Sequence, residues 1–167
     1  HPGNIGSSAR AMKTMGLKNL SLVAPKVFPS TEAEALASGA TDLLQNARVV
    51  QSVEEAVAAA DWVVGTSSRA RAVSMPTLDV REAAHQMADH FAANHGEIAI
   101  LFGPERTGLT NHCLDRCHQL ITIPTSESYA SLNLAAAVQI VAYELRLAFN
   151  GTNIVAESSQ YPLATAA

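Results

Sequence analysis

The sequence has few of the residues that define several common protein classes. It contains two cysteines, Cys113 and Cys117, among 167 residues, which are too few for a disulfide scaffold. Charged residues make up only 16% and aromatic residues 5%, but 48% of the residues are hydrophobic, so the chain is not a disordered polar one. Because free cysteines are typical of a reducing compartment, we expect a cytoplasmic protein.

Long uninterrupted apolar runs are also missing. The longest apolar stretch, residues 132–149, is interrupted by four polar residues: Asn133, Gln139, Glu144 and Arg146. These residues argue against a membrane span, and we expect no membrane partner. No signal peptide is recognisable. The sequence opens at His1 without an initiator methionine, in a glycine-containing segment that we expect to be a turn, and we expect a fragment of a longer chain.

The net charge of −4 argues against a protein that coats nucleic acid by charge alone. The charges are unevenly distributed, however. Residues 1–31 contain four basic residues and no acidic one, whereas residues 32–65 contain six acidic residues and one arginine. This asymmetry favours a local basic surface that meets a polyanion, with ordinary scattered surface charge as the alternative.

Short apolar runs alternate with segments of helical periodicity along the chain. The runs predict strands at residues 19–24, 48–51, 62–65, 97–103 and 120–123. The periodic segments predict helices at residues 6–15, 31–38, 53–60, 79–94, 110–117 and 131–150. This alternation predicts an α/β fold with a parallel sheet covered by helices on both faces. Residues 1–150 form the expected domain, and residues 151–167 a tail or linker.

The last predicted helix is apolar nearly all round, which indicates burial on most sides. In a domain of this size, we expect a partner subunit to supply part of that burial. A central helix within one subunit is the alternative.

Three predicted strands are followed by loops rich in small and turn-forming residues, at residues 65–69, 103–109 and 124–133. Ligands of parallel sheets bind at the carboxyl ends of strands, and such loops expose backbone groups that suit a nucleoside-like ligand. The glycine patterns of common dinucleotide and nucleoside triphosphate sites are absent. A fourth segment, residues 4–10, ends in Arg10, whose guanidinium can grip a phosphate, with a plain surface arginine as the alternative.

A metal site is the weaker interpretation of a short segment with four possible ligands: His112, Cys113, Cys117 and His118. Cys113 and Cys117 share a helix face, but the two histidines do not, and the close cysteine spacing of structural zinc sites is absent. We therefore expect ordinary helix packing here and no metal.

Three of these segments together resemble the motifs of the SpoU branch of the SPOUT methyltransferases. They read Asn4-x-Gly6-x-x-x-Arg10, then Phe102-Gly103-Pro104-Glu105-Arg106-x-Gly108-Leu109, then Ile121-x-Ile123-Pro124 with Ser131-Leu132-Asn133-Leu134-Ala135. The resemblance covers residues 1 to 150 and implies a C-terminal deep trefoil knot, an obligate homodimer and S-adenosylmethionine as the cofactor. Family members begin with a strand ahead of the first motif, and this sequence lacks it.

The resemblance also implies roles for individual residues. The implied cofactor-binding residues are Thr66, Ser67, Ser68, Gly103, Ile123, Ala130, Ser131 and Leu132. The implied catalytic residues are Arg10, Asn4, Glu105, Ser131 and Asn133. Arg10 is expected to clamp a phosphate and the reacting 2′-oxygen, with a role as the base as the alternative. Independently of the resemblance, the basic residues Lys13, Arg69, Arg71 and Arg106 are candidate RNA contacts, with ordinary solvated surface positions as the alternative.

The resemblance thus implies methylation of a ribose 2′-oxygen on RNA. Within the branch, the similarity is greatest to enzymes that modify a pyrimidine of the tRNA anticodon loop. A SpoU-type methyltransferase of ribosomal RNA and a non-catalytic RNA- or nucleotide-binding module are the alternatives. Labelled methyl transfer separates the enzymes from the binding module.

Overall fold

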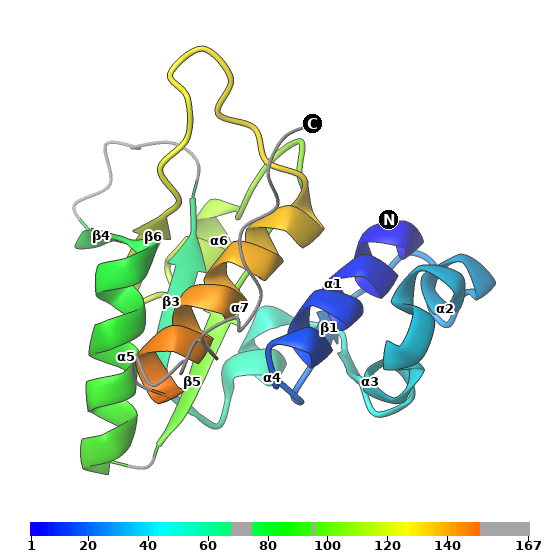
Figure 1. Ribbon diagram of the computed structural model, residues 1–167, viewed down its shortest axis with the longest axis horizontal. Coiled ribbons are helices and arrows are strands. Elements are labelled where there is room, and N and C mark those ends of the chain that lie inside the picture. The colour runs from blue at the N-terminus through cyan, green and yellow to red at the C-terminus, as the bar shows by residue number, and fades with distance from the viewer. Residues whose placement is uncertain (68–74, 95, 151–167) are drawn as a thin grey trace, which may run out of the picture.

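The structure, a computed structural model, describes residues 1–67, 75–94 and 96–150. The expected tail at residues 151–167 lies outside them. Strands and helices alternate in the described part, as the sequence predicts (Figure 1).

The strands form two parallel sheets. The larger one has the order β4-β6-β3-β5, with β3 at Ala60–Thr66, β4 at Thr77–Asp79, β5 at Glu97–Leu101 and β6 at Gln119–Thr122. The smaller one pairs β1 (Ser21–Val23) with β2 (Arg48–Val50). The predicted parallel pairing is confirmed, but the prediction of one sheet is wrong. Among the described residues, no strand lies between β5 and β1 to carry the hydrogen-bond ladder across.

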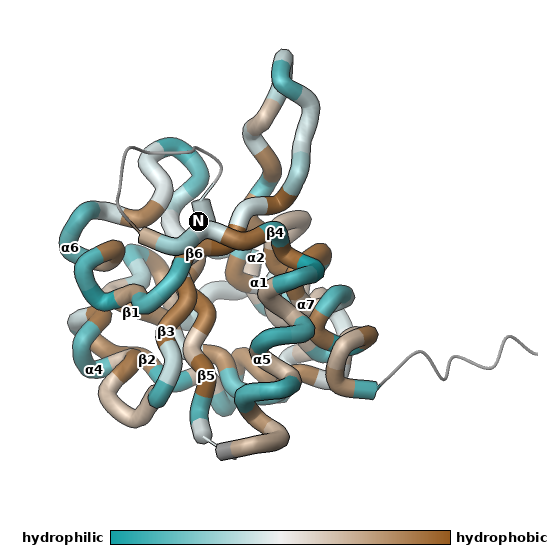
Figure 2. Tube along the Cα trace, turned by 90° about the vertical axis from the view of Figure 1, so that its left-hand side faces the viewer, coloured by the Kyte–Doolittle hydropathy of each residue, from teal (hydrophilic) through white to brown (hydrophobic). Residues whose placement is uncertain are grey.

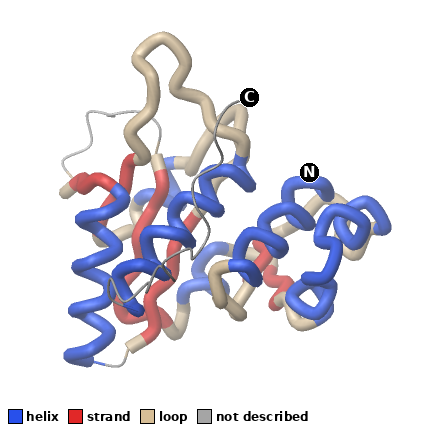
Figure 3. Tube along the Cα trace, viewed as in Figure 1, coloured by secondary structure: helices blue, strands red, loops and turns tan. Residues whose placement is uncertain are grey.

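Helices cover both faces of the larger sheet (Figures 1 and 3). Consecutive residues of β6 point to opposite faces. Ile121 packs in a core cluster with α5 (Val80–Asn94) and α7 (Leu134–Asn150). Its neighbour Leu120 packs on the other face with Leu114 of α6 (Asn111–Leu114). The predicted coverage of both faces is therefore confirmed.

The buried apolar residues of α5 and α7 follow the same helical spacing. They are Val80, Ala83, Ala84 and Met87 on α5, and Val138, Val141, Ala142 and Leu145 on α7. This spacing places each set on one stripe of its helix, facing the core. Two apolar side chains of α7, Tyr143 and Phe149, are each 45% exposed, so the single chain does not bury this helix all round. No helix among the described residues is both long and apolar enough to cross a membrane.

An ion pair fastens α5 to α7. The carboxylate of Glu144 is nearly buried, and it accepts hydrogen bonds from Nε of Arg81 at 3.2 Å and from Nη2 at 3.1 Å. Glu144 raises the pKa of Arg81 by stabilising the charged guanidinium. The two-pronged pairing satisfies this nearly buried carboxylate, which lies beside the apolar stripe of α7.

The N-terminal helices pack unusually closely. Helix α1 (Pro2–Thr14) crosses α2 (Thr31–Ala37), and a side chain at Gly6 would overlap the backbone carbonyl of Ala33. Helix α1 begins earlier than predicted, because Pro2 suits a first helical turn and Nδ1 of His1 accepts a hydrogen bond from the Gly3 amide. The predicted turn at this end is therefore wrong.

Three short elements were not predicted: η1 (Ser38–Ala40), α3 (Thr41–Gln45) and β4. Each has five residues or fewer, which is too short to show a period. The remaining short helix, α4 (Val53–Val57), begins where the sequence predicts, because Oγ of Ser52 accepts a hydrogen bond from the Glu55 amide.

Candidate active site

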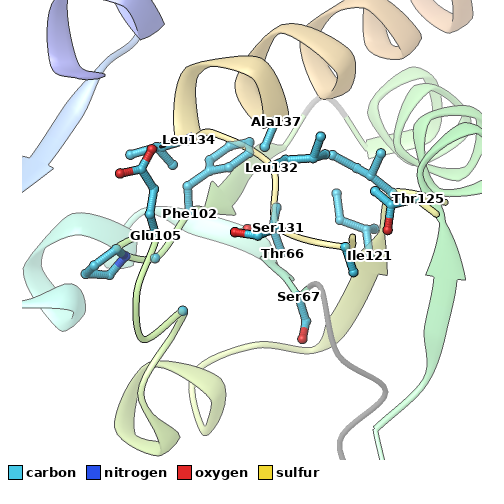
Figure 4. A pocket seen from close by; sticks show the side chains of 15 residues that line it. Thr66, Ser67, Phe102, Glu105, Ile121, Thr125, Ser131, Leu132, Leu134 and Ala137 are labelled. Atoms are coloured by element: carbon cyan, nitrogen blue, oxygen red, sulfur yellow. Dashed lines mark hydrogen bonds between the residues drawn. The ribbon is translucent and has the colours of Figure 1, made fainter. Parts of the chain in front are cut away.

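A pocket lies where the loops that follow β3, β5 and β6 meet the start of α7 (Figure 4). It encloses about 100 Å³, and about 620 Å³ when its open mouth is included. Its lining residues are Thr66, Ser67, Phe102, Gly103, Pro104, Glu105, Gly108, Ile121, Ile123, Thr125, Ala130, Ser131, Leu132, Leu134 and Ala137. The described residues of the three loops singled out in the sequence thus meet at the carboxyl edge of the sheet, where parallel sheets bind ligands.

Hydrogen bonds between strand ends fix the floor of the pocket. The hydroxyl of Thr66 donates to the carbonyl of Leu101 at 2.9 Å, which joins the ends of β3 and β5. The amide of Ser67 donates to the carbonyl of Ile121 at 3.0 Å, which extends the pairing of β3 with β6. The residues that line the floor therefore belong to the rigid sheet edge.

The loop after β5 folds tightly back on itself. A side chain at Gly103 would overlap the backbone of Gly108 and Leu109. The amide of Gly108 donates to the carbonyl of Pro104 at 2.7 Å, and the φ angle of +66° at Gly108 favours glycine. This tight turn carries Glu105 to the rim of the pocket beside Leu134 (Figure 4).

Glu105 is the centre of a polar network at the rim. Its Oε1 accepts hydrogen bonds from Nδ2 of Asn133 at 2.7 Å and from the amide of Leu134 at 3.0 Å. Nδ2 of Asn133 also donates to Oδ1 of Asn4 at 3.1 Å. Oδ1 of Asn133 accepts from the amide of Ala135 at 2.9 Å, so α7 begins later than predicted, after Asn133. Three of the expected catalytic residues are therefore brought together, from three separate segments.

The cofactor-binding candidates lie together as well. Ser68 falls outside the described residues, and all the others line the pocket: Thr66, Ser67, Gly103, Ile123, Ala130, Ser131 and Leu132. Ser131, which was also expected to be catalytic, is among these lining residues (Figure 4). The lining residues Phe102, Pro104, Gly108, Ile121 and Leu134 belong to the motifs quoted from the sequence but had no assigned role, and Thr125 and Ala137 lie outside those motifs. Except for Ala137 they flank the named positions in the same segments, and Ala137 lies one helical turn beyond Asn133.

Arg10 is not brought to this pocket within the single chain. It is exposed on α1 and is not among the lining residues. It follows Asn4 by six residues, which places it about 9 Å further along the helix and about 120° around it. Since Asn4 reaches Asn133, the side chain of Arg10 leaves α1 on a different face.

The candidate RNA contacts differ in their surroundings. Nζ of Lys13 is held by Oδ1 of Asp42 at 2.7 Å and by the carbonyl of Gly39 at 2.9 Å. This ion pair lowers the pKa of Asp42, mainly through the hydrogen bond from Lys13. Arg106 is exposed on the loop that carries Glu105. Arg69 and Arg71 lie outside the described residues.

The histidines and cysteines around α6 have structural contacts. Nδ1 of His118 accepts a hydrogen bond from the amide of Val63 at 2.9 Å, and Nε2 of His112 lies 2.8 Å from Oε1 of Glu54. Burial raises the pKa of the Cys117 thiol to about 11, which disfavours the thiolate that a metal requires. Within the described residues, no group of three or more ligating side chains could hold a metal ion.

The network at the pocket rim gives a first prediction. Glu105→Ala removes the acceptor of two hydrogen bonds that fix the start of α7, so we expect a loss of about 1–2 kcal/mol in the free energy of unfolding. Glu105→Gln keeps one acceptor oxygen and is expected to lose less than half of that. Urea denaturation measures both, with Glu127→Ala on an exposed loop as the matched control. Equal stability of all variants would contradict the role of Glu105.

Known proteins are similar to this chain over most of its length. The sequence profile of the SpoU rRNA Methylase family matches residues 1–143. A tRNA (cytidine/uridine-2'-O-)-methyltransferase, TrmJ, from Photorhabdus laumondii is 47% identical over 98% of this chain and 69% of its own length. A tRNA (cytidine/uridine/adenosine-2'-O-)-methyltransferase, also TrmJ, from Pseudomonas aeruginosa is 53% identical over 89% of this chain and 58% of its own. The chain thus spans 58% to 69% of the length of these two relatives.

A solved structure extends the likeness to three dimensions. The crystal structure of TrmJ from Z. mobilis ZM4 aligns with a TM-score of 0.82 and 42% identity. The alignment covers 87% of this chain and 64% of that one.

Proposed function

The chain belongs to the SpoU rRNA Methylase family, and on that premise we propose that it methylates a ribose 2′-oxygen of tRNA with S-adenosylmethionine. The favoured target is a pyrimidine of the anticodon loop. The proposed location of the reaction is the cytoplasm. Both relatives are tRNA 2'-O-methyltransferases, which supports a tRNA substrate. The convergence of three strand-end loops on one pocket is the observation that carries the proposal.

The pocket lining suits S-adenosylmethionine. Ile123 and Leu132 provide apolar surface for an adenine ring, and the hydroxyls of Thr66 and Ser131 provide polar partners for a ribose or an amino acid moiety. The absence of a side chain at Gly103 lets the loop after β5 fold back tightly beside the pocket. When bound, the cofactor's positive sulfur supplies an electrophilic methyl group.

The protein's own part in the reaction is alignment and charge stabilisation. In the proposal, Arg10 grips the phosphate and the 2′-oxygen of the target nucleotide with its planar fork. Guanidinium groups stay protonated in proteins, so the hydroxyl proton passes to a phosphate oxygen or to water. Asn4, Glu105 and Asn133 hold the rim at which the ribose arrives.

A homodimer completes this site in the proposal. Arg10 leaves α1 away from the pocket of its own chain, so a partner subunit's arginine would serve each pocket. The exposed apolar side chains of α7, Tyr143 and Phe149, support a further interface. The deep trefoil knot is part of the same proposal. Its support is the family resemblance, together with the meeting of the loops after β3 and β6 beside α7.

Ribosomal RNA is the second candidate substrate, because the name of the matching family refers to rRNA. Tritium-labelled S-adenosylmethionine, offered with a tRNA transcript or a ribosomal RNA fragment, compares the two. The proposal predicts label in the tRNA, and none when the target pyrimidines are replaced by 2′-deoxynucleotides. Transfer that persists on the deoxy transcript, or transfer to the ribosomal fragment alone, would overturn it.

A further inference from the structure

The loop between β6 and α7 projects from the body of the molecule (Figures 1 and 2). Tyr129, on this loop, is 77% exposed, more than any other large apolar side chain in the described ranges. The whole sequence has only three tyrosines, four phenylalanines and one tryptophan. An aromatic ring exposed to this degree contributes little hydrophobic stabilisation to the fold, so its surface is available to a binding partner.

The loop holds Tyr129 in a defined position. Its amide donates a hydrogen bond to the carbonyl of Ser126 at 3.2 Å, and the two residues form an antiparallel bridge. The hydroxyls of Ser126 and Ser128 lie 2.9 Å apart and close the same turn. The backbone that carries the ring is therefore fixed at both sides of the turn, and a ring needs only two side-chain torsions to be ordered.

The residues that flank this turn in the sequence line the pocket. Thr125, just before it, and Ala130, just after it, both line the pocket. Consecutive Cα atoms are about 3.8 Å apart, so the Cα of Tyr129 lies within one residue of the pocket wall. A nucleotide whose ribose reached the pocket mouth would bring its base next to this turn, which carries Tyr129.

We propose that Tyr129 stacks on the base of the nucleotide whose ribose is methylated, an inference that rests on the proposed function. Bases of single-stranded RNA loops are unstacked from their neighbours, and aromatic side chains bind them by stacking. Such stacking is tolerant of sequence, because every base has a π face. Tyr129 therefore selects for an unpaired, everted nucleotide rather than for a particular base.

Three substitutions separate stacking from other roles of the side chain. Tyr129→Ala and Tyr129→Leu both lack an aromatic face, and each is expected to lower kcat/KM for the RNA by about 5- to 100-fold. Tyr129→Phe keeps the ring, loses only the hydroxyl, and is expected to stay within about twofold of the wild type. Tyr129→Leu retains apolar bulk, so full activity in this variant would overturn stacking as the mechanism.

The adenine of the cofactor is the other base that could meet the ring, and calorimetry distinguishes the two sources. With RNA as the source, the Kd for S-adenosylhomocysteine is unchanged in Tyr129→Ala. An RNA with an abasic ribose at the target position adds a second arm. On this RNA the variant and the wild type are expected to have equal kcat/KM, because the base is gone. A weakened Kd for S-adenosylhomocysteine, or a loss of the same size on the abasic RNA, would overturn the proposal.

A binding readout keeps this inference separable from the proposed function. With 2-aminopurine at the target position and S-adenosylhomocysteine present, stacking on Tyr129 quenches the fluorescence of the wild-type complex, and Tyr129→Ala relieves the quenching. Methyl transfer by the wild type with equal quenching in both proteins would overturn the stacking and leave the proposed function standing. Quenching that depends on Tyr129, without any methyl transfer, would support the stacking and contradict the proposed function.

Discussion

Arg10→Ala is expected to lower methyl transfer by about 10²- to 10³-fold, the usual effect of removing one donor that stabilises developing charge. The affinity for S-adenosylhomocysteine is expected to stay within about threefold of the wild type, because Arg10 does not line the pocket of its own chain. Single-turnover transfer to tRNA and calorimetry measure the two effects. Full transfer by this variant would contradict the role assigned to Arg10.

The chain offers good controls for this result. Arg10 is exposed and alanine favours helices, so the substitution leaves α1 intact. The hydrogen bond from the Thr14 hydroxyl reaches only the backbone carbonyl of Arg10, which the variant retains. Arg10→Lys keeps the charge without the planar fork and is expected to recover only part of the activity.

A mixing experiment tests whether Arg10 acts on the pocket of the partner subunit. Arg10→Ala supplies an intact pocket, and Gly103→Ala supplies an intact arginine. In a mixture of equal amounts, half of the dimers combine the two chains, and one of their two sites is complete. Activity of about a quarter of the wild type is therefore expected. If each arginine served its own chain, the mixture would have no more activity than the separate variants.

Gly103→Ala is expected to disable the pocket itself. The added methyl group would overlap the backbone of Gly108 and Leu109, which a flexible side chain cannot relieve, so the loop after β5 must move. We expect a loss of about 1–3 kcal/mol in the free energy of unfolding. The affinity for S-adenosylhomocysteine is expected to fall by at least about tenfold, measured by calorimetry.

Gly39→Ala is the matched control for this substitution. No atom lies within 4 Å of the position of its added methyl group, so neither stability nor cofactor affinity is expected to fall. If Gly103→Ala bound S-adenosylhomocysteine as tightly as Gly39→Ala does, the tight turn would not be needed for the cofactor.

Elements fixed by neighbouring residues were predicted well from the sequence. Ser52 and Thr110 start α4 and α6 as their side chains indicate, because both accept a hydrogen bond from the amide three residues on. In the strand at Glu97–Leu101, residues 98–101 form a continuous apolar run, as expected for a strand covered on both faces. The position of the pocket followed from the rule that parallel sheets bind ligands at their carboxyl edge.

Contacts between distant residues were not predictable in the same way. Asn133 and Asn4 are 129 positions apart, and Lys13 and Asp42 are 29 apart. No local pattern encodes either pairing, although the family resemblance had already singled out Asn4 and Asn133. The division into two sheets depends on which strands are neighbours in space, and the exposure of Tyr143 depends on how α7 packs. These features depend on tertiary packing, which the periodicity of the sequence does not predict.

The proposed function requires that the three loops form one S-adenosylmethionine pocket. Calorimetric titration with S-adenosylhomocysteine tests this requirement most directly. The titration uses the chain at a concentration at which sedimentation shows a folded dimer. Saturable binding of one ligand per chain, lost in Gly103→Ala and kept in Gly39→Ala, is the predicted result. A folded dimer that binds no S-adenosylhomocysteine would contradict the proposed function.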